Sequence, residues 1–167
     1  MPEEDDVRIE EEPAAGRAAQ QCLKRYYEEL NRRFEGGFDP GKSVLASLDE
    51  FSPPKGSFLV VRTNGEPVGC GGLTPLRDAA YLKRMWIAPS ARGRGLAKLL
   101  LGALEDKAGD LGYRIVRLET NKALPEAQQL YRSSGYTEIE PFNDEHYADH
   151  WFEKRLDLNP LLGPTPE

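Results

Sequence analysis

The sequence predicts an α/β protein, in which a mixed central sheet of about six to seven strands is layered with about four helices. Apolar runs of strand length alternate with segments whose apolar residues recur at helical spacing. Near the middle of the chain a strand, a glycine turn and a leucine-rich helix follow one another directly. The 167 residues suffice for a domain with a buried core. We therefore expect one domain over residues 1–158, with an acidic leader at 1–6 and a loose tail at 159–167.

The N-terminal part is expected to form an edge strand and two helices. Val7 and Ile9 alternate with charged residues, as in a short edge strand. A helix is expected over residues 13–34, opened by proline and ended by glycines. A shorter helix is expected over residues 43–50, capped by Ser43. The apolar stripe of the first helix consists of Cys22, Leu23, Tyr26, Tyr27, Leu30 and Phe34.

A β-hairpin is expected next. Residues 57–62 and 67–73 are apolar runs of strand length, and Asn64-Gly65 between them is a hairpin turn signal. Three glycines in the second strand indicate either a weak strand or a close contact, at positions 69, 71 and 72.

The C-terminal half continues the alternation of strands and helices. A leucine-rich helix is expected from residue 96 to the glycines at 109 and 112, because its apolar residues keep helical spacing. A second helix is expected from Pro125 to Tyr131, before Gly135. The remaining expected strands lie at residues 81–87, 113–119, 136–139 and 150–156.

The glycine turn between the strand at 81–87 and the following helix has the features of an anion site. The first turn of a helix leaves backbone N–H groups unpaired, and these favour a phosphate. Gly93 and Gly95 lack Cβ atoms, so a ligand can approach the backbone closely. Arg92, Arg94 and Lys98 add positive charge at the same end.

Acidic and basic residues are segregated along the chain. Residues 79–104 contain no acid and five bases, whereas residues 138–153 contain six acids, both histidines and no Lys or Arg. One segment favours an anionic ligand and the other a cationic one. A domain with both is suited to bringing a polyphosphate cofactor to an amine; chance segregation of surface charge is the alternative.

Composition excludes several classes of protein. The net charge of −6 comes from residues 1–12, which hold seven acids and one base; the other 155 residues balance to zero. Without a basic face we expect no nucleic-acid partner. Two distant cysteines, Cys22 and Cys70, predict reduced thiols, with neither a disulfide nor a metal site. No apolar leader or long uncharged apolar run is present, so we expect a cytoplasmic protein without membrane contact, either a monomer or a homodimer.

Two sets of residues stand at a distinctive spacing. Residues 92–97 form an R-x-x-G-x-A run, which is neither a P-loop nor a dinucleotide fingerprint. The second set comprises Asn121, Ala127, Tyr131, Gly135 and Tyr136. Together they resemble the GNAT superfamily of acetyl-CoA-dependent N-acetyltransferases, over a region from about Val7 to Leu156. The runs KRMWIAP (83–89) and FNDEHYADHWFEK (142–154) are similar to those of its small single-domain bacterial members.

This resemblance implies a GNAT fold, with the sheet split at the acetyl-CoA site. The main chain of Trp86 and Ile87 would then hold the pantetheine arm, although core packing is the alternative for the Trp86 indole. The backbone of the glycine turn would hold the pyrophosphate. The cofactor-binding residues implied in addition to Trp86 and Ile87 are Arg92, Gly93, Arg94, Gly95, Leu96, Ala97, Lys98, Asn121 and Tyr131.

The resemblance also implies direct acetyl transfer within a ternary complex. Tyr131 matches the tyrosine that protonates the departing thiolate, and a phenol with a pKa near 10 is protonated at neutral pH. Packing at a helix end is its alternative role. Related sequences place a glutamate two residues before the KRM triplet, where this chain has Tyr81. Glu119, at the end of a strand beside the split, is our candidate general base, with a solvated or salt-bridged strand end as the alternative. His146 and His150 are other candidates for the base, directly or through water.

The acceptor is expected to be a small amine held beneath the segment that follows the last helix. The expected contacts are Tyr81, Phe142, Asp144, Glu145 and His150. Three functions follow from the sequence. The first is acetyl transfer from acetyl-CoA, the co-substrate, to a small primary amine; the second is acetylation of a protein lysine or N-terminus; the third is a non-catalytic acyl-CoA-binding module.

Overall fold

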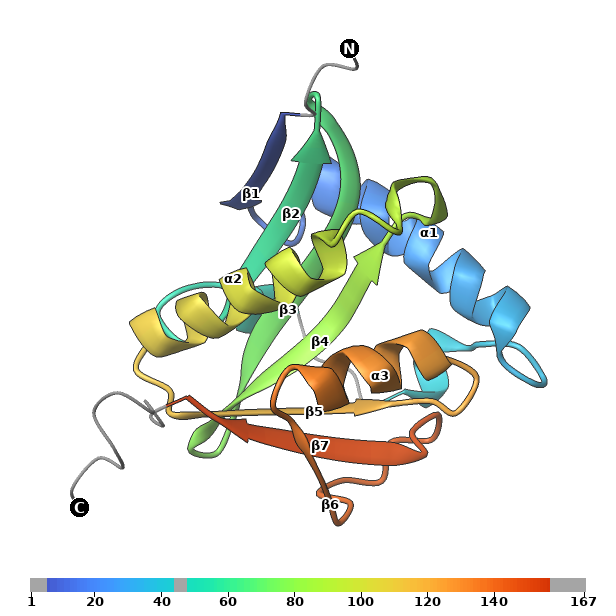
Figure 1. The fold of residues 1–167 in the computed structure, drawn as a ribbon, viewed down its shortest axis with the longest axis vertical. Helices are drawn as coiled ribbons and strands as arrows, with labels where there is room; N and C mark the ends of the chain where they lie inside the picture. The colour runs from blue at the N-terminus through green and yellow to red at the C-terminus, as the bar shows by residue number, and fades with distance from the viewer. Residues whose placement is uncertain (1–5, 44–47, 157–167) are drawn as a thin grey trace.

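The computed structural model describes residues 6–43 and 48–156, which form one seven-stranded sheet in the order β1-β2-β3-β4-β5-β7-β6 (Figure 1). The strands are β1 (Val7–Glu11), β2 (Ser57–Thr63), β3 (Glu66–Leu76), β4 (Ala79–Ile87), β5 (Ile115–Thr120), β6 (Thr137–Ile139) and β7 (His150–Arg155). The α-helices are α1 (Arg17–Arg33), α2 (Leu96–Asp110) and α3 (Pro125–Ser133). Three short 3-10 helices accompany them, η1 (Pro40–Lys42), η2 (Leu48–Phe51) and η3 (Pro89–Ala91).

The sheet splits between its central strands β4 and β5. These two strands are parallel, whereas every other neighbouring pair is antiparallel. They are paired only at Ala80 with Val116 and at Tyr81 with Arg117. Beyond Tyr81 they diverge, which Figure 1 shows as an opening between β4 and β5. The edge of β4 that faces β5 therefore has no strand partner over its last six residues.

Helices cover both faces of the sheet. In Figure 1, α1 lies behind β3 and β4, while α2 and α3 lie in front of the sheet, α3 over β5 and β7. The helix expected after Gly95 is confirmed as α2. Of its expected core residues, Leu96, Leu100, Leu104 and Ala108 are buried, whereas Leu99 is 56% exposed. Burying one stripe of each helix on the sheet is what stabilises this layered arrangement.

Glycines allow β3 to lie close to its neighbours. A Cβ at Gly71 would lie 2.8 Å from Leu104 Cδ1, and one at Gly72 would lie 2.4 Å from the Phe51 ring. The close contact expected at these glycines is therefore present. Between Cys70 and Gly72 the pairing with β4 shifts register, and Arg84 opposite has a φ of +59°. This bulge bends β4 within the part of the strand that has separated from β5.

The order of strands and helices expected from the sequence is confirmed, with local differences. The first helix begins at Arg17 rather than at residue 13, because Gly16 forms its N-cap and its N–H bonds to the Pro13 carbonyl. The helix expected over residues 43–50 lies partly outside the described residues. The parts that are described belong to two 3-10 helices, η1 and η2, and Ser43 is the C-cap of η1. Of the expected leader and tail, residues 1–5 and 157–167 lie outside the described residues.

Candidate active site

The turn before α2 presents open backbone N–H groups to a cavity. Gly93 and Gly95 have φ values of +83° and +78°, and a Cβ on either would meet no protein atom within 4 Å. Gly95 is the N-cap of α2 and has no capping side chain. A cavity of about 270 Å³ lies beside this turn, between β4, α1 and α3. Its wall includes Trp86, Ile87, Arg92, Gly93, Gly95, Leu96, Ala97, Leu130 and Tyr131.

A buried carboxylate organises this first cavity. Glu29 on α1 is 6% exposed, and its carboxylate accepts hydrogen bonds from Arg92 Nη2 at 2.6 Å and from Trp86 Nε1 at 2.9 Å. Arg92 Nε also donates to the Ile87 carbonyl at 3.0 Å. Burial acts to raise the pKa of Glu29, but the bonds from Arg92 and Trp86 outweigh it and the pKa is lowered. Glu29 is therefore ionised, and Arg92 is held by it.

The same network joins α1 to α3. Arg33 donates to Glu29 at 3.2 Å, to the Ala123 carbonyl at 3.0 Å and to Glu126 Oε2 at 3.0 Å. The pKa of Glu126 is lowered, chiefly by the hydrogen bonds from Arg33. The glycine turn, α1 and α3 thus meet through four charged side chains around the first cavity.

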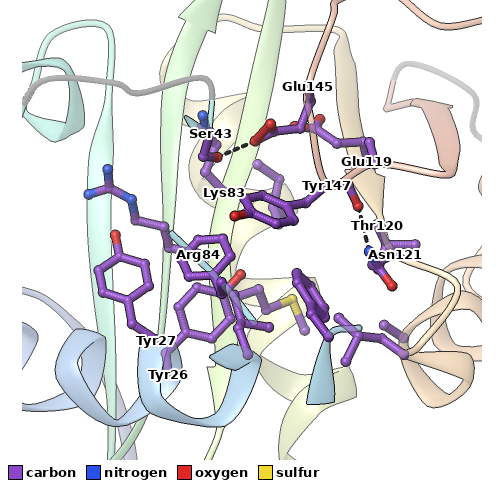
Figure 2. Close-up of a pocket in the computed structure, with 18 of the residues that line it drawn as sticks. Tyr26, Tyr27, Ser43, Lys83, Arg84, Glu119, Thr120, Asn121, Glu145 and Tyr147 are labelled. Carbon is purple, nitrogen blue, oxygen red and sulfur yellow. Dashed lines mark hydrogen bonds between the residues drawn. The ribbon is translucent and has the colours of Figure 1, made fainter. Parts of the chain in front are cut away.

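A second cavity, of about 140 Å³, adjoins the first and lies at the split of the sheet (Figure 2). The two cavities share a wall that consists of Tyr26, Leu30, Met85, Leu124, Ala127 and Tyr131. The other residues around the second cavity include Tyr27, Phe34, Phe38, Ser43, Lys83, Arg84, Glu119, Thr120, Asn121, Glu145 and Tyr147. The two cavities are therefore neighbours, with these six residues between them.

Glu119 brings an unusual carboxylate to the second cavity. Its Oε1 accepts a hydrogen bond from the Tyr81 hydroxyl, whereas its buried Oε2 has no hydrogen-bond partner among the described residues. Burial raises the pKa of Glu119 to about 7, against the opposing effects of the Tyr81 hydrogen bond and the charge of Lys83. A carboxylate with this pKa can take up and release a proton near neutral pH.

Tyr81 is fixed behind Glu119 by a chain of hydrogen bonds. Asn143 Nδ2 donates to the Tyr81 hydroxyl at 2.8 Å, and Trp151 Nε1 donates to Asn143 Oδ1 at 2.9 Å. The Phe142 ring packs edge-on against Tyr81, with 5.6 Å between the ring centroids. Tyr81 thus orients Glu119, and neither Tyr81 nor Phe142 lines a cavity. Both residues, expected as acceptor contacts, therefore lie outside the two cavities, Tyr81 next to Glu119.

Tyr131 stands where the two cavities meet. It is 7% exposed, belongs to α3 and lines both cavities. No hydrogen bond within the described residues involves its hydroxyl, which leaves that group able to bond a ligand. Burial, with a smaller effect of the Glu119 charge, raises the pKa of Tyr131 above its usual value. The phenol is therefore protonated throughout the neutral range.

Most acids of residues 138–153 are engaged away from the cavity. Glu138 pairs with Arg132 at 2.7 Å and with His150 Nδ1 at 2.7 Å, and His150 lines neither cavity. Asp144 is exposed and lines neither cavity. Glu145 does line the second cavity, where it accepts a hydrogen bond from Ser43. Of the five expected acceptor contacts, the structure brings only Glu145 to the second cavity. Asp144 is exposed, His150 pairs with Glu138, and Tyr81 and Phe142 pack against each other outside the cavity.

Three of the expected cofactor contacts also lie outside the first cavity. Asn121 lines the second cavity, where its Nδ2 donates to the Tyr147 carbonyl at 2.7 Å and its Oδ1 accepts from the Ala123 N–H at 2.7 Å. Asn121 thus ties the loop around Tyr147 to the end of β5. Arg94 and Lys98 are exposed beside the turn and line neither cavity.

Comparison with known proteins agrees with this geometry. The sequence profile described as the acetyltransferase (GNAT) family matches residues 23–136. The chain belongs to the GNAT acetyltransferase family. It is therefore an acyltransferase of the N-acetyltransferase class. Among the described residues of this family member, no helix has the length and apolarity needed to cross a membrane.

Two relatives of this GNAT protein share about a third of their aligned residues with it. "IAA acetyltransferase" of Azospirillum brasilense is 32% identical over 125 residues, which is 74% of this chain and 82% of that protein. The uncharacterized N-acetyltransferase YjgM of Escherichia coli K12 is 32% identical over 138 residues, which is 80% of this chain and 81% of that protein.

Solved structures share the fold at lower identity. A GNAT-family acetyltransferase of Staphylococcus aureus Mu50 superimposes with a TM-score of 0.73 at 20% identity, covering 90% of this chain and 99% of that one. A GNAT acetyltransferase of Elizabethkingia anophelis, solved with acetyl-CoA bound, gives a TM-score of 0.62 at 16% identity, covering 92% of this chain and all of that one.

Proposed function

We propose that this protein transfers the acetyl group of acetyl-CoA to the primary amine of a small molecule. Acetyl-CoA occupies the first cavity, with its pyrophosphate at the turn of residues 92–97. The acceptor occupies the second cavity, and the two substrates meet at the shared wall beside Tyr131. The observation that carries the proposal is the position of Glu119, which lines the second cavity, is held by the Tyr81 hydroxyl and has a pKa of about 7.

Glu119 can remove the proton that an amine acceptor carries at neutral pH. An alkylammonium with a pKa near 10.4 is only about 0.04% neutral at pH 7, so it must lose a proton before it attacks. The Glu119 carboxylate accepts that proton, directly or through one water, while the Tyr81 hydroxyl holds Oε1 in place. The nitrogen then forms a bond to the thioester carbonyl carbon.

Two groups on opposite sides of the reacting centre complete the reaction. The edge of β4 beyond Tyr81 has no strand partner, so backbone N–H groups near Ile87 are placed to stabilise the oxyanion. The Tyr131 hydroxyl donates its proton to the sulfur as the carbon–sulfur bond breaks, and the nitrogen gives up its second proton to the resulting tyrosinate, directly or through water, which leaves a neutral amide. The products are the N-acetylated amine and the free CoA thiol.

Contacts between two loops favour a small acceptor over a protein. The Asp39 N–H donates to the Tyr147 hydroxyl at 2.7 Å, and Ser43 donates to Glu145. The Phe38 and Tyr147 rings pack with 4.8 Å between their centroids. These contacts bring residues 38–43 and 145–147 together at one side of the second cavity, where a polypeptide acceptor would need an open groove.

Acetyl-CoA turnover tests the proposal directly. The purified protein is incubated with acetyl-CoA and either a panel of small primary amines or lysine-containing peptides, with thiol release and product mass as readouts. We expect acetylated small amines. Faster acetylation of peptides would instead assign the protein as a protein acetyltransferase, and acetyl-CoA binding without any turnover would overturn the catalytic roles of Glu119 and Tyr131.

A further inference from the structure

Aromatic side chains dominate one side of the second cavity. Tyr26 and Tyr27 come from α1, Phe34 and Phe38 follow them in the chain, and Tyr147 comes from the loop before β7. Their rings form a continuous cluster. Tyr27 stacks on Phe38 with an interplanar angle of 20° and 5.5 Å between centroids, and the Tyr147 centroid lies 5.5 Å from that of Phe34. Five rings from three segments thus make one wall, which we call the aromatic wall.

The carboxylates that can bind an amine lie across the second cavity from the tyrosines of α1. Figure 2 shows Glu119 and Glu145 on the side opposite Tyr26 and Tyr27. If the acceptor nitrogen lies at the Glu119 carboxylate, the remainder of the acceptor molecule therefore extends toward the aromatic wall. Flat rings pack on such a wall in stacked or edge-on geometry, which stabilises them beyond the effect of burial alone.

The basic side chains of the cavity point to an acceptor without a carboxylate. The Lys83 ammonium lies over the Tyr81 ring, 4.7 Å from its centroid, and the Arg84 guanidinium lies 4.9 Å from the centroid of Phe51. Neither Tyr81 nor Phe51 lines the cavity. Both cations are thus engaged by rings outside the space that the acceptor occupies.

From these observations we propose that the acceptor is a small aromatic amine, namely a planar ring joined by a short linker to a primary amine and carrying no carboxylate. This inference rests on the proposed function and specifies its substrate. The ring lies against the aromatic wall and the nitrogen lies at Glu119. A polyamine would need several carboxylates along its length, whereas only Glu119 and Glu145 line the described part of the cavity. A cavity of about 140 Å³ also favours a compact molecule.

A panel of matched amines tests this inference. The kcat/KM values are measured for 2-phenylethylamine, 2-cyclohexylethylamine, propylamine, phenylalanine and spermidine. Phenyl and cyclohexyl rings have similar size and apolarity, so their ratio reports planarity and π contact rather than burial. We expect 2-phenylethylamine to exceed 2-cyclohexylethylamine by about 2- to 10-fold. It should exceed propylamine, phenylalanine and spermidine by at least about 10-fold, since each lacks the ring or carries extra charge.

Variants of the aromatic wall test whether these rings cause the preference for a phenyl over a cyclohexyl substrate. Phe38→Leu and Tyr27→Leu each keep an apolar side chain, so the phenyl to cyclohexyl ratio should fall toward one. Tyr113→Leu is the matched control, because Tyr113 lines neither cavity and bonds to the Lys55 carbonyl. Its ratio should remain that of the unmodified protein.

The outcomes separate this inference from the proposed function. If no amine of the panel consumes acetyl-CoA, acetylation of small amines itself is overturned. If cyclohexylethylamine, phenylalanine or spermidine is acetylated as well as phenylethylamine, the aromatic acceptor is wrong while amine acetylation stands. A preference for the phenyl ring that survives both wall variants would likewise overturn the assignment to the aromatic wall.

Discussion

The Glu29 carboxylate lies 2.6 Å from Arg92 Nη2 and thereby connects α1 to the glycine turn, across 63 residues of sequence. The pair is completed by the Trp86 indole, so one buried anion holds both a residue of β4 and the first residue of the turn. Arg92 in turn bonds the Ile87 carbonyl. We therefore propose that Arg92 is a structural cation, which would leave the backbone of the turn to bind the phosphates.

Glu29→Gln should weaken acetyl-CoA binding. The substitution keeps the shape but removes the charge that holds Arg92, and charge-assisted hydrogen bonds are about twice as strong as neutral ones. We expect the KM for acetyl-CoA to rise about 10-fold while the acceptor KM changes little. Glu28→Gln, one residue earlier and exposed, is the control and should change neither KM. An equal rise of both KM values would mean that α1 is disturbed as a whole.

Gly95→Ala should reduce acetyl-CoA affinity through the new methyl group. Gly95 has a φ of +78°, so any L-residue there costs about 1–2 kcal/mol in strain. Gly65→Ala is a matched control, since Gly65 has a φ of +86° and a Cβ there also meets nothing within 4 Å. Both variants should lose similar unfolding free energy, but calorimetry should show weaker binding only for Gly95→Ala. Unchanged affinity in a folded Gly95→Ala protein would remove the turn from the cofactor site.

Tyr131→Phe should slow the chemical step and leave acetyl-CoA binding intact. The ring is retained and only the proton donor is lost, so kcat should fall by about 100-fold or more. Tyr136→Phe is the control, because its hydroxyl bonds Glu105 and Tyr136 lines neither cavity. The control should keep its kcat. A normal kcat for Tyr131→Phe, with chemistry shown to limit the rate, would leave Tyr131 as a packing residue.

The pH dependence of kcat should report the carboxyl group of Glu119. A general base must be deprotonated, so kcat should rise with pH through about 7, the pKa of this group. Glu119→Gln should lower kcat by about 100-fold and abolish that inflection. Glu145→Gln should move the inflection to lower pH, because the nearby charge of Glu145 helps to raise the pKa of Glu119. An inflection that is unchanged in both variants would assign it to another group.

The free energy of unfolding should depend on pH through the carboxyl group of Glu119. The folded pKa of Glu119 lies above its ordinary value of 4.5, so the folded state binds the proton more tightly than the unfolded state. Its contribution to the free energy of unfolding should therefore fall as pH rises from about 4.5 to about 7, and stay constant above that. Urea unfolding should show Glu119→Gln gaining stability relative to the unmodified protein across this window, by at most about 3 kcal/mol.

Glu138→Gln is the control with the opposite sign. Hydrogen bonds from His150 and Arg132 lower the pKa of Glu138, so its stabilising contribution is present above its unfolded pKa and is lost as pH falls through the folded one. Because Glu138 is largely exposed, its effect should be small. A stability difference for Glu119→Gln that is independent of pH would show that the Glu119 carboxyl is not perturbed.

Local patterns were sufficient to predict the order of elements and the position of the glycine turn. The alternation around Val7 and Ile9, the Asn64-Gly65 turn and the leucine spacing after Gly95 each depend on a few neighbouring residues, and each is confirmed. Backbone conformation follows from such short-range chemistry. The turn is conspicuous in the sequence because only glycine adopts positive φ without strain.

The tertiary structure alone decided which charged and aromatic side chains serve the cavities. Glu29 is one acid among the charges of α1 in the sequence, and only the fold places it against Arg92. Tyr26 and Tyr27 have the spacing of core residues, yet they line a cavity where the sheet splits. The pKa of Glu119 depends on burial by residues far away in the chain. Desolvation and ion pairing act between residues that are distant in the sequence, so they cannot be predicted from its periodicity.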